Sequence, residues 1–413
     1  MTSVLKYGSD SQITFELPPE TLIAECGKPA GDPIDDPSAA MAAGLISPWG
    51  LPPLAECVLP DDRVAIVLHD ELPRADELLI GAVKTFLEAK VDPTGISILI
   101  SDRYANLDLE PVLRASTGHD ITVKRHNPSD RDELAYLGTS GEGKPILLNR
   151  TIVDAEFVLP IGCLRVDSAP GYYGVDGTVF PAFGDEEARK RFGAPSNEEW
   201  AAHRRRRREE VEEVARLLGV VMTVQIAPGS RGELLQVIVG EPGTIKKRAR
   251  DTCDAIWNYK IPRRASLVIA AIEGGAECQT WDNVALATAA ASAAVADGGA
   301  IALCTDLDSP PGAALQRLTE LRDFETTLLE LKKDSSPDVT AATQLLQALQ
   351  QYRVYLLSNL DDELVEDLGM APIGDETELV RLSQRYETCI LLSNAQFAVA
   401  LPEEDALSLE ERD

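Results

Sequence analysis

The stretch RVAIVLHDELPRADELLIGAVKTFLEAKVDPTGISILI, residues 63–100, decides the fold class. Its apolar runs at 63–68 and 96–100 have the length and β-branched content of buried strands. Between them, residues 75–89 place apolar side chains at helical spacing, and a turn at 92–95 leads into the second run. This order predicts a βαβ unit, and strands that are apolar throughout favour a parallel sheet covered on both faces.

The same alternation continues on both sides of a break at 259–264. Before this break, residues 220–228 and 233–242 are expected to form a hairpin pair, and 245–262 a helix that ends at Pro262. A chain of 413 residues is too long for one ordinary hydrophobic core, so two domains are expected. We predict two α/β domains, 1–258 and 263–413, which face each other across an interdomain cleft. The first contains a mostly parallel sheet, and the last residues of the chain could return to it.

Charge and cysteine usage restrict the partners and the compartment. Lys and Arg number 39 against 68 Asp and Glu, and a net charge of -29 repels nucleic acids and anionic membranes. The seven cysteines form no CxxC pair, which is typical of a reducing compartment. The longest apolar run, 284–304, is broken by Asp297, and the first residues do not resemble a secretory signal. The sequence predicts a cytoplasmic protein with small-molecule ligands and leaves its oligomeric state open.

A glycine-rich loop follows the strand predicted at 155–162. Gly171, Gly174 and Gly177 recur at every third position around Tyr172 and Tyr173. This spacing lets backbone N–H groups approach a bound anion closely. The alternative is a crossover loop packed by its aromatic side chains, and the pattern matches neither of the common glycine-rich nucleotide motifs.

Ligands of open α/β sheets bind outside the carboxyl ends of the strands, which directs attention to the residues there. Asp70 and Arg74 follow the first strand, where they could bind phosphate or carboxylate or else cap the next helix. Arg103 follows the second strand, where it could contact a ligand or form a surface ion pair. Trp281 begins a helix of the second domain, as a stacking surface or a core aromatic.

Metal and nucleic-acid motifs are weak. The four histidines have no metal-binding spacing, so the metal is unknown, and His69 with its acidic neighbours is the only local cluster that could hold one. The arginine run at 204–208 is flanked by acidic residues on both sides. It predicts a solvated helix face with ion pairs between residues four apart.

Taken in order, the segments 63–100, 126–184 and 354–386 resemble the nickel-dependent lactate racemase family. The most specific parts are DELAYLGT at 132–139, NRTIVDAEFVLPIG at 149–162 and the glycine-rich loop. The resemblance implies a two-domain α/β protein that holds a nickel pincer made from nicotinic acid mononucleotide. In that family the pincer takes a hydride from the α-carbon of a 2-hydroxy acid. Return of the hydride to the other face of this carbon inverts its configuration.

The resemblance assigns roles to several residues and shows departures. Asp167 stands where the family has its nickel-binding histidine, and Gly177 stands where a lysine tethers the cofactor. A catalytic histidine is replaced by Asp102, while the arginine beside it survives as Arg103.

Further positions correspond more loosely. Asp70 and a shifted Arg74 match the phosphate-contacting pair, and Gly171 to Gly174 with both tyrosines would cradle the cofactor. Trp281 and Asn283 would contact substrate, but the Gln and Lys expected after them fall on Leu286 and Ala289.

Three functional hypotheses follow. The resemblance implies a racemase or epimerase of a small 2-hydroxy acid, an isomerase if active, whose nickel-pincer nicotinic acid mononucleotide is not covalently tethered. Carboxylates suit nickel less well than imidazole, and Asp102, with a usual pKa of about 3.9, would need a raised pKa to act as a base. The alternative is therefore a non-catalytic homologue that binds a small acid or nucleotide. A third is a lyase or hydrolase with a hard divalent cation on Asp70, Asp102 and Asp167.

Overall fold

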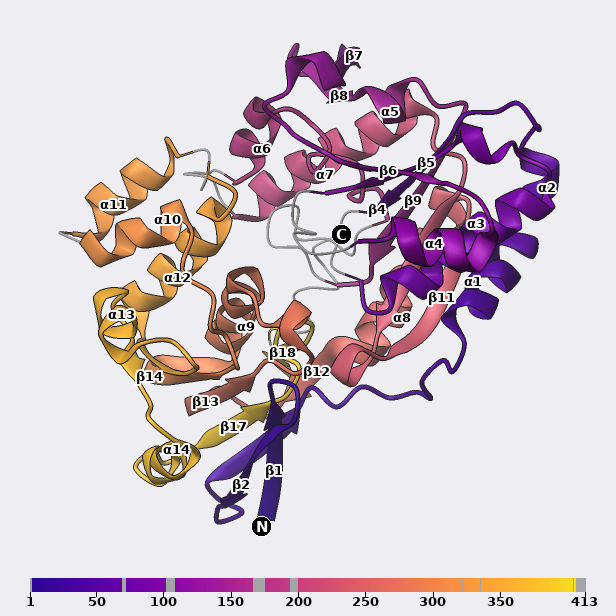
Figure 1. The fold of residues 1–413 in the computed structure, drawn as a ribbon. Coiled ribbons are helices and arrows are strands. Elements are labelled where there is room, and N and C mark those ends of the chain that lie inside the picture. Colours follow the sequence, from indigo (N-terminus) through magenta and orange to yellow (C-terminus); the bar gives the residue numbers. More distant parts are fainter. Residues whose placement is uncertain are drawn as a thin grey trace. The chain divides into compact units, whose positions relative to one another are not determined.

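The structure is a computed structural model, shown in Figure 1. It describes residues 2–68, 72–101, 108–165, 175–193, 200–320, 323–334, 336–403 and 405, without the side chains of 193 and 200–204. Contacts within the chain divide it into two compact units. Unit 1 comprises Met1–Ala30, Gly193–Asn197 and Ala255–Asp413, and unit 2 comprises Gly31–Phe192 and Glu198–Asp254.

Unit 2 is built on a six-stranded sheet in the order β11-β10-β9-β4-β5-β6. All neighbours are parallel except β10 and β11, which form the antiparallel pair expected at 220–242. The predicted βαβ unit is present, because a helix, α3, connects the parallel neighbours β4 and β5. The strands are β4 (Val64–Leu68), β5 (Ile96–Ile100), β6 (Thr122–Arg125), β9 (Phe157–Cys163), β10 (Thr223–Pro228) and β11 (Leu234–Gly240).

Helices cover both faces of this sheet, as its apolar strands predict. On one face, α1 and α3 pack so closely that a Cβ on Gly81 would lie 2.4 Å from the carbonyl oxygen of Ser38. On the other face, Ala65 and Val67 pack with Val211 and Val214 of α7. The helices are α1 (Pro37–Ile46), α2 (Leu54–Cys57), α3 (Ala75–Glu88), α4 (Glu110–Thr117), α5 (Arg150–Val153), α6 (Glu186–Gly193) and α7 (Trp200–Leu218).

Smaller elements complete unit 2. A hairpin of β7 (Leu134–Thr139) and β8 (Pro145–Asn149) lies beside the start of α5. Short 3-10 turns occur at η1 (Pro93–Gly95), η2 (Arg131–Glu133) and η3 (Ser230–Gly232). The chain passes from unit 2 to unit 1 within α8 (Pro242–Trp257).

Unit 1 contains a second six-stranded sheet, parallel throughout, in the order β16-β15-β14-β13-β17-β3. One face of the sheet packs against the N-terminal hairpin of β1 and β2 and against α14. Helices α9 and α12 pack against each other, and α9 also contacts β13 and β14. The strands of the sheet are β3 (Leu22–Cys26), β13 (Ala265–Ala271), β14 (Val295–Cys304), β15 (Arg353–Leu357), β16 (Ala371–Pro372) and β17 (Cys389–Leu392).

The other elements of unit 1 surround this sheet. The hairpin consists of β1 (Thr2–Tyr7) and β2 (Ser11–Glu16), and β12 (Asn258–Ile261) pairs with β18 (Val399–Pro402). The helical segments are η4 (Ala276–Cys278), α9 (Trp281–Ala294), α10 (Ala313–Gln316), η5 (Arg317–Glu320), α11 (Phe324–Leu331), α12 (Val339–Gln351), α13 (Asp362–Asp367) and α14 (Glu376–Ser383).

The fold is mixed α/β with mostly parallel sheets, as predicted, but the chain divides differently from the ranges 1–258 and 263–413. Residues 22–26 form β3, which pairs with β17 at an edge of the unit 1 sheet. The first thirty residues therefore belong with the C-terminal segment. Another difference is that residues 258–261 leave the helix predicted there and form β12.

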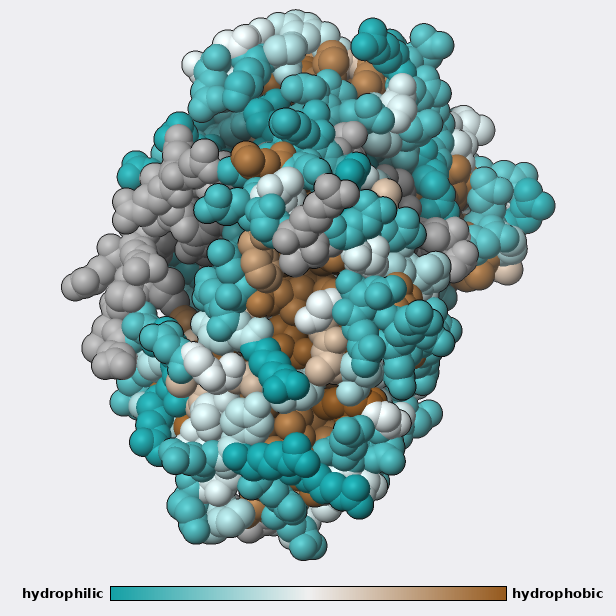
Figure 2. Space-filling model, turned by 90° about the vertical axis from the view of Figure 1, so that its left-hand side faces the viewer, coloured by the Kyte–Doolittle hydropathy of each residue, from teal (hydrophilic) through white to brown (hydrophobic). Residues whose placement is uncertain are grey.

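Most of the face in Figure 2 is hydrophilic, with apolar side chains gathered in smaller areas. In the part of the chain that the structure describes, no helix is long and apolar enough to cross a membrane.

Candidate functional site

The candidate site is the carboxyl edge of the unit 2 sheet, where three neighbouring parallel strands end together. β4 lies between β5 and β9 in the sheet. The N–H of Ser101 donates to the carbonyl oxygen of Leu68 at 3.2 Å, so the ends of β4 and β5 are held side by side. On the other flank, the N–H of Leu164 donates to the oxygen of Ile226 at 2.7 Å. The segments predicted to carry the chemistry therefore leave the sheet from adjacent strands.

Most of the predicted site residues follow these strand ends but lie outside the described residues. Their roles stay predictions. They are Asp70 after β4, Asp102 and Arg103 after β5, and Asp167, Gly171, Tyr172, Tyr173 and Gly174 after β9.

Arg74 is described, and its side chain is engaged within unit 2. It lies just before α3 with a left-handed backbone, φ 53°. Its guanidinium forms two hydrogen bonds with the Glu77 carboxylate and donates to the carbonyl oxygens of Ile34 at 2.9 Å and Asp35 at 3.1 Å. The hydrogen bond to Glu77 raises the pKa of Arg74 above its usual value. A phosphate contact by Arg74 would compete with these partners.

Gly177 is the other described residue of the predicted cofactor loop, and charged groups surround the residue before it. Asp176 lies 3.8 Å from the ammonium of Lys246 on α8, and the same ammonium contacts the carboxylate of Glu212 on α7. Only 14% of the Asp176 side chain is exposed. Burial, the largest cause, raises the pKa of Asp176 above its ordinary value. We call Asp176, Lys246 and Glu212 the loop-exit cluster.

Sequence reasoning missed this cluster. Asp176 falls among the glycines, but nothing near it in the sequence points to its partners, because Lys246 is far along the chain. The charged helix α7 supplies Glu212, yet the alternating charges of that helix predicted only local pairs.

The arginine-rich segment of α7 is partly a tertiary contact and only partly a solvated face. Arg205 forms the expected exposed ion pair with Glu209, at 3.0 Å. Arg207, in contrast, is 7% exposed and donates to the carbonyl oxygen of Arg191 at 3.1 Å. Its guanidinium lies over the ring of Phe192, 5.6 Å from the centroid. The prediction was therefore incomplete, because long arginine side chains can pack their planar groups on aromatic faces.

The one buried histidine of unit 2 that the structure describes is structural. The Nε2 of His126 lies 2.8 Å from the carbonyl oxygen of Gly184, and Nδ1 lies 3.2 Å from the amide nitrogen of Asn149. The carbonyl needs a donor, so Nε2 carries the proton and Nδ1 accepts from Asn149. Both ring nitrogens are then engaged in a neutral imidazole.

The predicted substrate contacts of unit 1 stabilise the start of α9. Trp281 is 8% exposed, and its indole N–H donates to the carbonyl oxygen of Ser309 at 3.0 Å. The amide of Asn283 donates to the carbonyl oxygen of Cys278 at 2.8 Å, and its backbone N–H is capped by the Thr280 hydroxyl at 3.2 Å. Both side chains therefore have internal hydrogen-bond partners, and their contact with substrate stays a prediction.

At the carboxyl edge of the unit 1 sheet, buried polar side chains bond to one another and to the backbone. The Asn394 amide donates to Glu273 Oε1 and to the carbonyl oxygen of Gly27, both at 3.0 Å. Gln279 donates to the Gly274 oxygen at 2.9 Å and accepts from the Thr305 hydroxyl at 2.7 Å and from the N–H of Asp306 at 3.0 Å. Gln396 donates to the carbonyl oxygen of Glu273 at 2.8 Å, and we call these side chains the edge network of unit 1.

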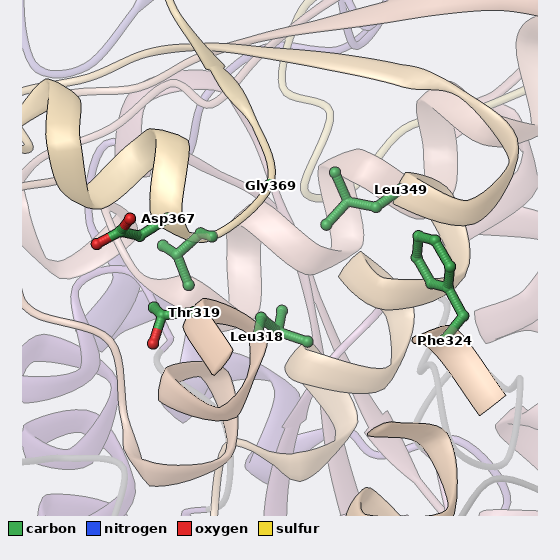
Figure 3. A pocket seen from close by; sticks show the side chains of 7 residues that line it. Leu318, Thr319, Phe324, Leu349, Asp367 and Gly369 are labelled. Atoms are coloured by element: carbon green, nitrogen blue, oxygen red, sulfur yellow. The ribbon is translucent and has the colours of Figure 1, made fainter. Parts of the chain in front are cut away.

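Unit 1 also contains a cavity of about 280 Å³ among its helices, shown in Figure 3. Thr319 and Asp367 lie on one side of it, and Phe324 and Leu349 lie on the other. No residue predicted for the site lines this cavity. Its remaining lining residues are Leu318, Leu368 and Gly369.

Together these features define an α/β protein whose parallel strands end at a candidate ligand-binding edge. Residues 7–191 match the family model described as the lactate racemase N-terminal domain. The resemblance seen in the sequence is therefore confirmed: residues 7–191 match this domain family, and the protein is lactate-racemase-like.

Two solved structures share the fold. The lactate racemase apoprotein from Thermoanaerobacterium thermosaccharolyticum is 17% identical, with a TM-score of 0.76 over 97% of this chain and 100% of that chain. A structural-genomics target from Thermotoga maritima is 12% identical, with a TM-score of 0.66 over 89% and 99%. A comparison with curated proteins gives no significant match.

The described residues do not fit a covalently tethered nickel pincer. Gly177, at the position of the family's lysine, offers no amine, and both nitrogens of His126 are engaged. Within the described ranges, no group of three or more His, Cys, Asp and Glu side chains could hold a metal ion.

Proposed function

We propose that this protein is a racemase or epimerase of a small 2-hydroxy acid and that its site lies at the carboxyl edge of the unit 2 sheet. The observation that carries the proposal is that β5, β4 and β9 end side by side and fall within the residues that match the lactate racemase N-terminal domain. Parallel sheets bind their ligands at this edge. Asp102, Arg103 and Asp167, which follow these strands, are the proposed catalytic residues.

Any nickel-pincer nicotinic acid mononucleotide would be held without a covalent bond, because Gly177 has no side chain to attach. The proposed cofactor contacts are Asp70, Arg74, Gly171, Tyr172, Tyr173, Gly174 and Gly177, and the proposed substrate contacts are Trp281 and Asn283. We also propose that the protein works in the cytoplasm on small molecules, and that nucleic acid is not a partner, because its net charge of -29 opposes one.

A second function is favoured by a specific observation. Where the family has an imidazole and an amine, this chain has Asp167 and Gly177. Carboxylate is a harder ligand than imidazole and suits nickel less well. A non-catalytic homologue that binds a small acid or nucleotide at the same edge is therefore the alternative.

Expression in cells that synthesise the nickel cofactor separates the two functions. The racemase proposal expects stoichiometric nickel, a visible absorbance band and conversion of L-lactate or another 2-hydroxy acid to its epimer by chiral chromatography. Asp102→Asn and Asp167→Asn should then lower the rate. Metal-free protein that is stabilised by a hydroxy acid without converting it would support the binding homologue and contradict the racemase.

A further inference from the structure

The loop-exit cluster joins three segments that are distant in the sequence. Lys246 on α8 places one ammonium against Asp176, which follows the glycine-rich loop, and against Glu212 on α7. The side chains of Lys246 and Glu212 are each 31% exposed, and Asp176 is more buried. A single partly buried cation thus holds two carboxylates from different elements.

The chain just beyond Asp176 is fixed by the core. Val179, Phe180 and Phe183 are buried with residues of the sheet and of α7. The N–H of Phe183 donates to the carbonyl oxygen of Val179 at 3.0 Å, which closes a turn. The backbone at Gly177 is therefore bounded by an ion pair on one side and by packed aromatic side chains on the other.

Burial disfavours the charged form of Asp176. Its pKa is raised, chiefly by burial and also by Glu212, although Lys246 and Arg216 act in the opposite direction. A carboxyl whose pKa is higher in the folded than in the unfolded state adds stability below its unfolded pKa and loses it as the pH rises through its folded pKa. Near pH 7 the charged Asp176 therefore costs stability. Groups that reduce stability concentrate where geometry serves binding.

We propose that Lys246 is a positioning residue for the ligand site at the unit 2 edge. By holding Asp176 and Glu212 together, it keeps the backbone at Gly177 in one geometry where the glycine-rich loop ends. The inference rests on the proposed function, because it assigns Lys246 a part in ligand binding there. Lys246 acts through Asp176 and is not placed in contact with the ligand.

Amide hydrogen exchange on the ligand-free protein tests the positioning directly. Lys246→Met should raise the exchange of peptides covering 175–184 by about tenfold, equivalent to about 1.4 kcal/mol of local opening. Lys247→Met is the matched control, because Lys247 forms an exposed pair with Asp251 on the same helix and is 84% exposed. Lys246→Arg keeps the positive charge, so its peptides covering 175–184 should exchange as slowly as those of the wild type. Wild-type exchange in Lys246→Met would overturn the inference.

Asp176→Asn separates positioning from folding. The variant removes a costly buried charge, so its melting temperature should equal or exceed that of the wild type. Its affinity for lactate, measured by calorimetry, should nevertheless fall about tenfold because the ion pair is lost. A parallel loss of stability and affinity, or an unchanged affinity, would overturn the inference.

The pH profile gives a further readout. As the pH falls through the raised pKa of Asp176, the wild-type affinity for lactate should approach the affinity of Asp176→Asn. Because lactate protonates equally in both experiments, comparison with this variant corrects for protonation of lactate itself. If the wild-type and Asp176→Asn affinities differ by the same factor at every pH, the result would count against Lys246 as a positioning residue. If the wild type binds no hydroxy acid at all, the proposed function fails, and the exchange experiment alone decides whether the cluster fixes the backbone.

Discussion

The carboxyl edges of the two sheets are stabilised in different ways. At the edge of unit 1, Asn394 donates to Glu273 and to the backbone of Gly27, and Gln279 bonds to Thr305 and to the backbone of Gly274. In unit 2, the described contact that adjoins the predicted loop in the sequence is a salt-bridge cluster that includes a carboxylate of raised pKa. The difference teaches that hydrogen bonds to the strand-end backbone stabilise the edge of unit 1, whereas in unit 2 an ion-pair cluster holds the chain just beyond the loop of the proposed ligand site.

The largest expected effect is in the edge network of unit 1. Asn394→Ala removes two buried hydrogen bonds and puts alanine at φ 47°, so we expect a loss of about 3 kcal/mol in the free energy of unfolding. Urea unfolding measures it. The control is Asn359→Ala, which removes one exposed bond to the carbonyl oxygen of Asp306. A loss below about 1 kcal/mol for Asn394→Ala would contradict the stabilising role of this edge.

Gln279→Leu tests the same edge at a smaller magnitude. It leaves the Thr305 hydroxyl and the N–H of Asp306 without their acceptor, and we expect a loss of about 2 kcal/mol in urea unfolding. Its affinity for lactate should stay at the wild-type value, because Gln279 is not among the proposed ligand contacts. A selective loss of affinity with wild-type stability would reverse the comparison between the edges.

Arg74→Met measures how much the hydrogen-bonded Arg74 side chain contributes to the stability of unit 2. It loses the bonds to the carbonyl oxygens of Ile34 and Asp35, and partial exposure limits the expected loss to about 1 kcal/mol. Glu77→Gln, which keeps those carbonyl bonds, is the control and should lose less. A much larger drop in ligand affinity than in stability would instead support the predicted phosphate contact.

The smallest effect is expected at the opposite end of the unit 2 strands, where Arg63 pairs with Glu156. The hydrogen bond with Arg63 lowers the pKa of Glu156 to about 2. A carboxyl with a lowered folded pKa adds stability above its unfolded pKa, and this is lost as the pH falls from about 4.5 toward 2. Both side chains are exposed, so Glu156→Gln should shift the melting temperature at pH 7 by less than about 2 °C. A larger shift in the melting temperature would show that this ion pair also contributes substantially to stability.

Local patterns predicted the parts of the fold that local forces determine. The βαβ unit at 63–100 and the antiparallel pair at 220–242 follow from apolar periodicity and turn residues. The position of β3 could not be predicted in this way, because its pairing with β17 joins the two ends of the chain. Local propensity carries no information about such a partner.

The same reasoning explains what was missed at the site. Strand ends and glycines marked the segments near the ligand edge, but the contact of Lys246 with Asp176 depends on how α8 folds back on unit 2. For Trp281 and Asn283, the sequence showed side chains able to bind a ligand. It could not show that the carbonyl oxygens of Ser309 and Cys278 already occupy their donors.

Hydrogen exchange of the full chain with and without saturating L-lactate tests the central claim most directly. The account predicts protection in peptides that follow β4, β5 and β9, covering 69–74, 102–107 and 165–177. Protection confined to the unit 1 edge at 273–279 and 394–396, or to the helices around the 280 Å³ cavity, would contradict it.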